Sequence, residues 1–201
     1  MKTRRDFLKL AGLTITSACM GMSKEFKFDS FPKWNILLLT ADDMQYDTPG
    51  CFGGKVSNVT PNLDKLASQG MIFKKAHVNV AVCTPSRSVI QTGRYQHNNG
   101  VMEFQLIKDG VPTLTECLHD AGYYNGIIGK ATIGGKGPNY ESYGDTYKEH
   151  WDYLVVGDID NNFGRNPELY YKQSDEFFKK VKPSGKPFFL MANSHDPHRP
   201  F

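Results

Sequence analysis

The sequence has few cysteines and little net charge, and each shortage excludes a class of protein. Four cysteines in 201 residues are too few for a small secreted domain held together by disulfides. The formal net charge is +3, and residues 1–18 carry all of it, so the rest of the chain has equal numbers of basic and acidic side chains. A neutral body without a run of lysine and arginine lacks the electrostatic footprint of a nucleic-acid-binding protein. We therefore expect no nucleic acid among the partners.

The uncharged stretch near the amino end is too short to cross a membrane. Leu10–Ser23 has 14 residues, whereas a spanning helix needs about 20. The stretch follows the basic segment Thr3–Lys9, in which Arg4 and Arg5 are adjacent, and this order resembles a bacterial twin-arginine export signal. We interpret residues 1–23 as an export signal, which predicts a periplasmic or cell-surface protein; a frayed basic terminus is the alternative.

The end of this stretch also resembles a lipoprotein cleavage box. Thr16-Ser17-Ala18-Cys19 has the small residues and the cysteine of such a box. Thr16 stands where these boxes usually carry Leu or Val, so a lipid anchor on Cys19 is left open.

Residues 24–201 predict an α/β fold. Asn35–Thr40 is a continuous apolar run, which is typical of a central strand buried on both faces. Strands and helices alternate after it, and this alternation indicates a mostly parallel sheet with helices on both faces. Residues 134–166 show no steady period and are interpreted as loop. The further predicted strands cover 71–73, 124–128 and 188–192, and the predicted helices cover 61–69, 84–92, 113–122 and 168–181.

Local signals mark where these helices begin. Threonine-proline pairs at 60–61 and 84–85 each predict an N-cap followed by a proline at the first helical position. Thr113 and Glu116 have the spacing of a capping box, with Cys117 expected on the apolar face of that helix.

Chemically competent side chains follow the predicted strands. In parallel sheets, ligands gather at the carboxyl ends of the strands. Asp42 and Asp43 follow the first strand and are hard oxygen ligands suited to Ca²⁺ or Mg²⁺, with a solvated turn as the alternative. Lys130 follows another strand and His195 the last; a solvated lysine and a polar loop are the alternatives there.

Cys83 precedes a predicted helix start, where backbone N–H groups stabilise an anion. Arg87, one turn later, adds a cation whose planar donors match an oxyanion. This arrangement favours a nucleophilic or redox-active thiolate, and a small buried cysteine is the alternative.

The segment Cys83-Thr84-Pro85-Ser86-Arg87 resembles the signature of type I sulfatases. Thr60–Asp64, Thr92–Arg94 and the Asp-Asp pair at a strand end also resemble that family, in the expected order. Gly126–Lys130 and His195–Pro200 most resemble heparan N-sulfatases (sulfamidases). The resemblance implies an alkaline-phosphatase/sulfatase-like fold, truncated at its carboxyl-terminal side.

The resemblance also implies a mechanism. A maturation enzyme would oxidise Cys83 to formylglycine, whose hydrate attacks sulfur with one hydroxyl and expels sulfate with the other. Asp42, Asp43 and the modified Cys83 would bind Ca²⁺, or less favourably Mg²⁺, which acts as a Lewis acid. The expected substrate is a sulfated glycan, with a heparan N-sulfo group favoured.

The remaining roles follow from the same resemblance. Arg87 would hold the second hydroxyl, and Lys130 would contact the sulfate and the nucleophile. His195 would contact the sulfate and assist the leaving group, and His198 and Arg199 are expected to bind substrate.

One position departs from the family pattern. Thr132 stands where sulfatases usually carry a histidine that acts as a base, and a hydroxyl cannot hold a proton near neutral pH as imidazole does. His77 and His97 are candidates to replace it; a homologue with weak or no turnover, and a related metal-dependent phosphodiesterase or phosphonate hydrolase, are the alternatives.

The length of the chain limits the predicted site. A sulfatase domain would supply further metal ligands after Phe201, so we expect these 201 residues alone to bind Ca²⁺ poorly and to turn over nothing. Cys51 and Cys117 are expected to be unreactive.

Overall fold

The computed structural model describes residues 32–130, 149–157 and 164–199. The chain divides into two compact units, residues 1–33 and 34–201, and the described helices and strands belong to the second. The predicted export signal, the Cys19 anchor and Thr132 lie outside the described residues. Within the described ranges, no helix has the length and apolar composition needed to cross a membrane.

The described part of the chain contains a four-stranded sheet in the order β1-β4-β2-β3. Every pairing is parallel, with Leu38 opposite Met191 and Gly126 opposite Leu190. The carboxyl ends of the strands therefore meet at one edge of the sheet. The strands are β1 Ile36–Thr40, β2 Tyr124–Lys130, β3 Tyr153–Gly157 and β4 Phe188–Asn193.

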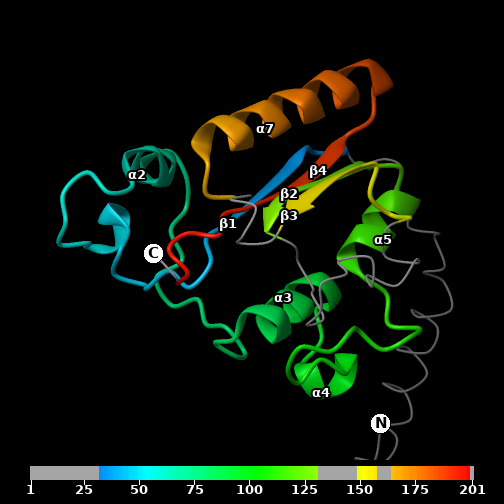
Figure 1. The fold of residues 1–201 in the computed structure, drawn as a ribbon, viewed down its shortest axis with the longest axis horizontal. Coiled ribbons are helices and arrows are strands. Elements are labelled where there is room, and N and C mark those ends of the chain that lie inside the picture. Colours follow the sequence, from blue (N-terminus) through cyan, green and yellow to red (C-terminus); the bar gives the residue numbers. More distant parts are fainter. Residues whose placement is uncertain (1–31, 131–148, 158–163, 200–201) are drawn as a thin grey trace, which may run out of the picture. The chain divides into compact units, whose positions relative to one another are not determined.

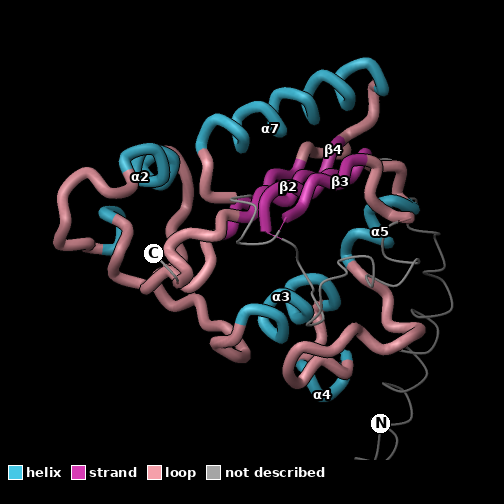
Figure 2. The backbone as a smooth tube through the Cα atoms, viewed as in Figure 1, coloured by secondary structure: helices cyan, strands magenta, loops and turns pink. Residues whose placement is uncertain are grey.

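Helices cover both faces of this sheet. Helix α7 crosses one face, whereas α3 and α5 lie on the other (Figure 1), and the tube view in Figure 2 shows the same layers. The predicted α/β architecture with a mostly parallel sheet is confirmed. The described helices are α2 Pro61–Ser68, α3 Cys83–Thr92, α4 Gln96–Asn99, α5 Leu114–Asp120 and α7 Pro167–Val181, with short 3₁₀ turns η2 Gly50–Phe52 and η5 Lys182–Ser184.

The core on the α7 face is built around Phe177, which is fully buried. Its ring lies against Ile128 and Leu190 of the sheet. Gly126 lets the ring approach, because a Cβ at that position would come within 2.3 Å of Phe177 Cε2. The position of α7 on the sheet thus depends on the absence of a side chain at Gly126.

The opposite face combines an apolar cluster with buried polar contacts. Ile127, Phe189 and Met191 are buried there, and Leu118 of α5 packs against them. Gln91 of α3 is also buried and donates to Met191 Sδ at 2.9 Å. This hydrogen bond joins α3, the helix that carries Cys83, to β4.

The helix-start predictions are confirmed at two of three places. Thr113 accepts from Glu116 N at 3.1 Å and its own N–H donates to Glu116 Oε2 at 3.2 Å, which is the expected capping box. Helix α2 begins at Pro61 as expected. The predicted cap at Thr84 is wrong: α3 begins at Cys83, with Val82 as its N-cap. Pro85 still fits, because proline is tolerated throughout the first helical turn.

Four further predictions fail for non-local reasons. The first strand is not central: β1 lies at an edge of the described sheet, and Leu39 is 55% exposed. Residues 71–73 form no strand, because the described chain brings no neighbour to pair with them. Residues 153–157, interpreted as loop, form β3 because β2 supplies their hydrogen bonds. Cys117 is exposed, and Thr115 takes the buried place on α5.

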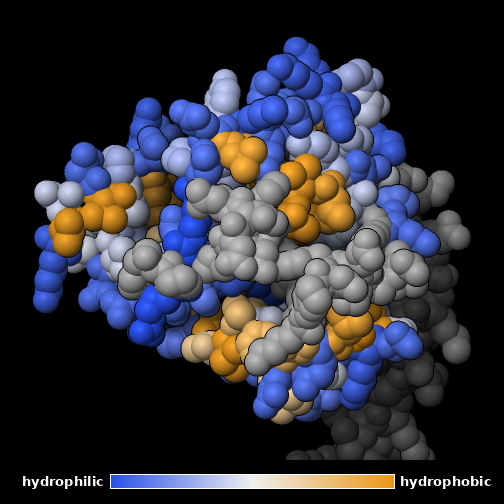
Figure 3. Space-filling model, viewed as in Figure 1, coloured by the Kyte–Doolittle hydropathy of each residue, from blue (hydrophilic) through white to orange (hydrophobic). Residues whose placement is uncertain are grey.

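Apolar side chains also reach the surface of the described chain. The view in Figure 3 shows them as separate patches between hydrophilic regions. The largest exposed fractions among these side chains belong to Met71 (78%), Tyr171 (76%) and Trp34 (75%).

Candidate active site

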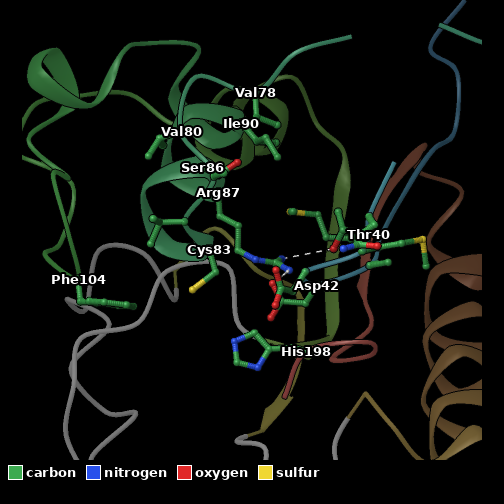
Figure 4. A pocket seen from close by; sticks show the side chains of 17 residues that line it. Thr40, Asp42, Val78, Val80, Cys83, Ser86, Arg87, Ile90, Phe104 and His198 are labelled. Carbon is green, nitrogen blue, oxygen red and sulfur yellow. Dashed lines mark hydrogen bonds and ion pairs between the residues drawn. The ribbon is translucent and has the colours of Figure 1, made fainter. Parts of the chain in front are cut away.

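A cavity of about 580 Å³ lies where β1, the β4 loop and the start of α3 meet. That volume is within the range of small-molecule sites, roughly 300–1,000 Å³. Asp42, Asp43, Cys83, Arg87 and His198 contribute polar groups to its wall. Figure 4 shows Cys83, Asp42 and His198 facing the same space, with Arg87 reaching toward Asp42 from α3. The rest of the wall is mainly apolar and includes Met44, Val78, Val80, Val82, Ile90 and Phe104.

Asp42 is the charge at the centre of this site. It is 4% exposed, and a carboxylate so buried needs compensating partners. Arg87 supplies one at 3.6 Å, and Lys130 Nζ contacts the other carboxylate oxygen. The backbone N–H of Asp42 donates to the Asp196 carbonyl at 3.2 Å. Asp42, Arg87 and Lys130 together carry a net charge of +1, and Asp43 on the same wall brings the formal charge of the four groups to zero.

A chain of hydrogen bonds fixes the two cations relative to the sheet. Arg87 Nη1 donates to Thr40 Oγ1 at 3.4 Å, and Thr40 donates to Asn193 Oδ1 at 2.6 Å. Asn193, which is fully buried, donates from Nδ2 to the Lys130 carbonyl at 2.8 Å. The ends of β1, β4 and β2 are thereby tied together at the site. The sequence analysis did not assign Thr40 or Asn193 to the site. The signal that could have found them is a polar residue at the end of each apolar strand.

Cys83 stands in the first turn of α3 and is half-buried. Its Sγ lies 4.0 Å from Thr84 Oγ1. The same turn is anchored from below, because Ser88 Oγ donates to the Pro85 carbonyl at 2.6 Å and Asn99 Nδ2 donates to Ser88 Oγ at 3.0 Å. Hydrogen bonds therefore hold the turn that carries Cys83, and Cys83 lines the cavity.

The two histidines of the loop after β4 have different surroundings. His198 lines the cavity. His195 is 3% exposed, donates its backbone N–H to the Gly164 carbonyl at 3.0 Å, and is not among the lining residues. Arg199 is exposed and also lies outside the lining.

The candidates to replace the missing base lie away from the cavity wall. His77 is exposed. His97 is exposed as well and stacks on Tyr95, with ring centroids 5.8 Å apart. Of the histidines in the described chain, the cavity lining contains His198.

Asp42 and Asp43 are suitable ligands for a hard cation, but two carboxylates are too few to complete its coordination. Asp43 lines the cavity and adopts a left-handed backbone with φ of 62°, a conformation that aspartate tolerates better than most residues. Asp42 is already paired with two cations. The described ranges contain no group of three or more His, Cys, Asp or Glu side chains placed to hold a metal ion. These residues by themselves do not complete a calcium site.

The other cysteines of the described chain are unpaired and lie outside the cavity. Burial, together with a hydrogen bond to Asp64, raises the pKa of the Cys51 thiol. A raised pKa lowers the thiolate fraction, which agrees with the expectation that Cys51 is unreactive.

Comparison with known proteins adds a family to this geometry. A sulfatase family model matches residues 34–201. Human iduronate 2-sulfatase is 30% identical over 231 aligned positions, which cover 100% of this chain and 42% of the relative.

Two solved structures share the fold. One, solved in complex with its substrate D-glucosamine-2-N,6-O-disulfate, has a TM-score of 0.68 at 23% identity, covering 84% of this chain and 35% of its own. The phosphonate monoester hydrolase of Agrobacterium radiobacter has a TM-score of 0.61 at 19% identity, covering 82% and 41%. The chain thus spans less than half the length of each of these proteins.

Proposed function

This chain belongs to the sulfatase family, and we propose that the protein hydrolyses a sulfate ester or sulfamate of a sulfated glycan. One observation carries the proposal. The signature cysteine, Cys83, opens onto a cavity in which Arg87 and Asp42 lie, and Lys130 pairs with Asp42 from the neighbouring strand. A nucleophile position beside two oriented cations is suited to a sulfuryl group, whose oxygens carry the negative charge.

The proposed nucleophile is the hydrate of formylglycine, formed from Cys83 by a maturation enzyme. Arg87 is fixed by Asp42 and Thr40, so its guanidinium is oriented before substrate arrives. Lys130 reaches the same carboxylate from β2. We assign to both cations the stabilisation of charge that develops on the sulfuryl oxygens.

His198 is the proposed proton donor to the leaving group. It lines the cavity with Cys83, whereas His195 is buried and is not among the lining residues. We assign His195 a supporting place in the loop, and Arg199 contact with the outer part of the substrate. An imidazole near neutral pH can hold and release the proton that the departing oxygen or nitrogen needs.

We also propose that Asp42 and Asp43 are two ligands of a divalent cation, Ca²⁺ in preference to Mg²⁺. Their carboxylate oxygens are the donors that hard cations prefer. Further ligands would have to join them, because the described residues do not make up a coordination shell.

A heparan N-sulfo group is the favoured substrate. The segment His195–Pro200 resembles sulfamidases, and a structural neighbour was solved with a glucosamine that carries N- and O-sulfates. An exported location, through the signal in residues 1–23 and with or without a lipid on Cys19, would give the protein access to such a glycan.

The experiment compares substrates on purified full-length protein. N-sulfoglucosamine, glucosamine 6-sulfate and a phosphodiester are offered in parallel, and sulfate or phosphate release is measured. The proposal expects sulfate release that is lost in Cys83→Ala, and an intact mass of the Cys83 peptide matching formylglycine, which is lighter than cysteine. Hydrolysis of the phosphodiester alone, or full activity with an unmodified thiol, would contradict it.

A homologue with weak turnover is separated by one further variant. Thr132→His restores the residue type usual at this position. If a missing base limits turnover, this substitution raises the steady-state rate; an unchanged rate rejects that explanation.

A further inference from the structure

We propose that Arg165 is a positioning residue that fixes the loop after β4 so that His198 stays over the cavity beside Cys83. Arg165 precedes α7 in the sequence and lies outside the cavity lining, so it cannot touch the reacting atoms from its observed place. The proposal rests on the proposed function, because it gives Arg165 a role through His198.

The guanidinium of Arg165 holds the loop at two points. Nη1 pairs with Asp196 Oδ1 at 3.0 Å, and Nη2 donates to the His198 carbonyl oxygen. The Arg165 side chain is 16% exposed and that of Asp196 is 53% exposed, so water screens the ion pair from the Asp196 side, whereas the guanidinium itself is largely enclosed. A planar fork that engages a carboxylate and a carbonyl at once fixes direction as well as distance.

The residue before it makes the same connection through its backbone. The Gly164 carbonyl accepts from His195 N at 3.0 Å and from Ser194 Oγ at 3.2 Å. Gly164 has a φ of 78°, and a Cβ there would come within 2.9 Å of His195 Cδ2 and 3.0 Å of the Asn193 carbonyl oxygen. The absence of a side chain at Gly164 therefore lets residues 164–165 lie close to the loop after β4.

The loop is also held from the side of the site. Ser194 N donates to the Thr40 carbonyl at 2.8 Å, and Asp42 N donates to the Asp196 carbonyl at 3.2 Å. These bonds fix the start of the loop, whereas Arg165 holds the His198 backbone itself. Without Arg165, His198 would keep, within the described residues, only local contacts: the bond from its N–H to the His195 carbonyl, at 2.9 Å, and the contact of its Nδ1 with the Arg199 carbonyl.

The consequence for the reaction concerns the leaving group. As the bond to sulfur breaks, the leaving oxygen or nitrogen takes the bonding electron pair and a proton from protonated imidazole, which becomes neutral. The sulfuryl group passes to one hydroxyl of the formylglycine hydrate at position 83, whose proton is released to solvent as the new S–O bond forms. The proton from imidazole matters most for a poor leaving group and little for a phenolate stabilised by a nitro group. A displaced His198 should therefore slow the reaction of substrates with poor leaving groups more than that of substrates with good ones.

The test measures kcat of the full-length protein on a sugar sulfate and on 4-nitrophenyl sulfate. Arg165→Met is expected to lower kcat about 10²-fold on the sugar sulfate, the loss that a displacement of about 1 Å can cause. On 4-nitrophenyl sulfate the expected loss is less than about threefold, since no proton is needed there. Arg165→Lys, which keeps one charge pair, should fall between. The matched control is Lys179→Met, which removes an exposed 2.6 Å ion pair between Lys179 and Asp175 of α7 and should leave both rates unchanged.

A second readout does not depend on activity. Amide hydrogen exchange of peptides covering residues 194–198 should accelerate in Arg165→Met and remain unchanged in Lys179→Met. If Arg165→Met does not fold, Asp196→Asn removes the same ion pair from the loop side and should show the same selectivity. Equal losses on both substrates, no loss on either, or unchanged exchange would overturn the proposal. A wild-type protein that releases no sulfate, with exchange still dependent on Arg165, would instead overturn the proposed function and leave the contact as structural.

Discussion

Asp42 shows how a single buried residue organises the charges around it. Its carboxylate is 4% exposed and is shared by Arg87 and Lys130, which arrive from a helix and from another strand. Removing one partner of a buried ion pair is costly because the other charge remains in a poorly solvated place. The two cations at this site are therefore held in position by the carboxylate, and the arrangement proposed to bind the sulfuryl group depends on all three groups.

Arg87→Met should lower kcat/KM for sulfate release about 10²- to 10³-fold, the usual loss when one preorganised donor to a developing anion is removed. The loss has two causes: a cation disappears from the cavity, and Asp42 keeps a single partner. Steady-state kinetics on the full-length protein measures it. Arg94→Met, at an exposed arginine just after the same helix, is the control and should retain wild-type kinetics. Comparable losses in both variants would show that general destabilisation, rather than the site, is responsible.

At the scale of the element, the contact between α7 and the sheet decides the stability of the layer opposite the site. Phe177 packs over Gly126, and Tyr153 of β3 meets α7 through a hydrogen bond from its hydroxyl to Glu176 Oε2 at 3.2 Å. The first contact depends on shape and the second on the protonation of a phenol. They predict two different responses.

Gly126→Ala should reduce the free energy of unfolding by about 1–3 kcal/mol, as for other overpacked cores. The added methyl would meet the Phe177 ring at 2.3 Å, and the ring is fully buried, so α7 must shift to accept it. Denaturant unfolding followed by circular dichroism measures the loss. Gly70→Ala is the matched control, because its Cβ would meet nothing closer than 3.5 Å. Equal effects of the two substitutions would argue against the packing explanation.

Tyr153 predicts a loss of stability in alkali. Burial, and then the nearby Glu176 carboxylate, raise the pKa of Tyr153 from 10.0 to about 12. Because the folded state holds the proton more tightly than the unfolded state, the stabilisation is complete below pH 10 and is lost as the pH rises through about 12. Unfolding between pH 9 and 12 should therefore be less pH-dependent in Tyr153→Phe than in wild type. Tyr171→Phe, on the exposed side of α7, should follow the wild-type curve; a Tyr153→Phe curve that also follows it would contradict this assignment.

At the scale of the whole molecule, the chain matches the sulfatase family from residue 34 to 201 and covers 42% of human iduronate 2-sulfatase. Within the described residues, the proposed nucleophile position at Cys83 lies near two cations. The candidate metal ligands on the cavity wall are Asp42, Asp43 and Cys83. Hard cations such as Ca²⁺ take 6–8 oxygen ligands at about 2.3–2.6 Å, so the visible donors are too few.

The isolated 201-residue chain should therefore bind Ca²⁺ weakly and release no sulfate. Titration calorimetry measures the binding, and the double variant Asp42→Asn, Asp43→Asn is the control, which should give nearly the same small heats. Tight binding at one ion per chain, abolished in the double variant, would contradict this expectation and show that the ligand set is complete.

Much of this protein could be predicted from the sequence, because the deciding interactions are local. The capping box of Thr113 and Glu116 spans four residues, and α7 and β4 lie within a residue of their predicted bounds. The sequence also placed Asp42 directly after a strand, and parallel strands bring their carboxyl ends to one edge; Asp42 and Cys83 both line the cavity there, and their roles in a reaction stay predictions.

Tertiary structure alone decided which residues meet. Thr40 and Asn193 are 153 positions apart, and their hydrogen bond exists because β1 and β4 are neighbours in the sheet. The same dependence on distant partners placed β1 at an edge of the sheet that the described residues form, and it placed His198 rather than His195 in the cavity lining. Capping and periodicity are set by residues within one or two turns, whereas burial and pairing are set by whatever the rest of the chain brings alongside. The sequence therefore determined the chemistry available to this protein, and the fold determined which of those groups face one another.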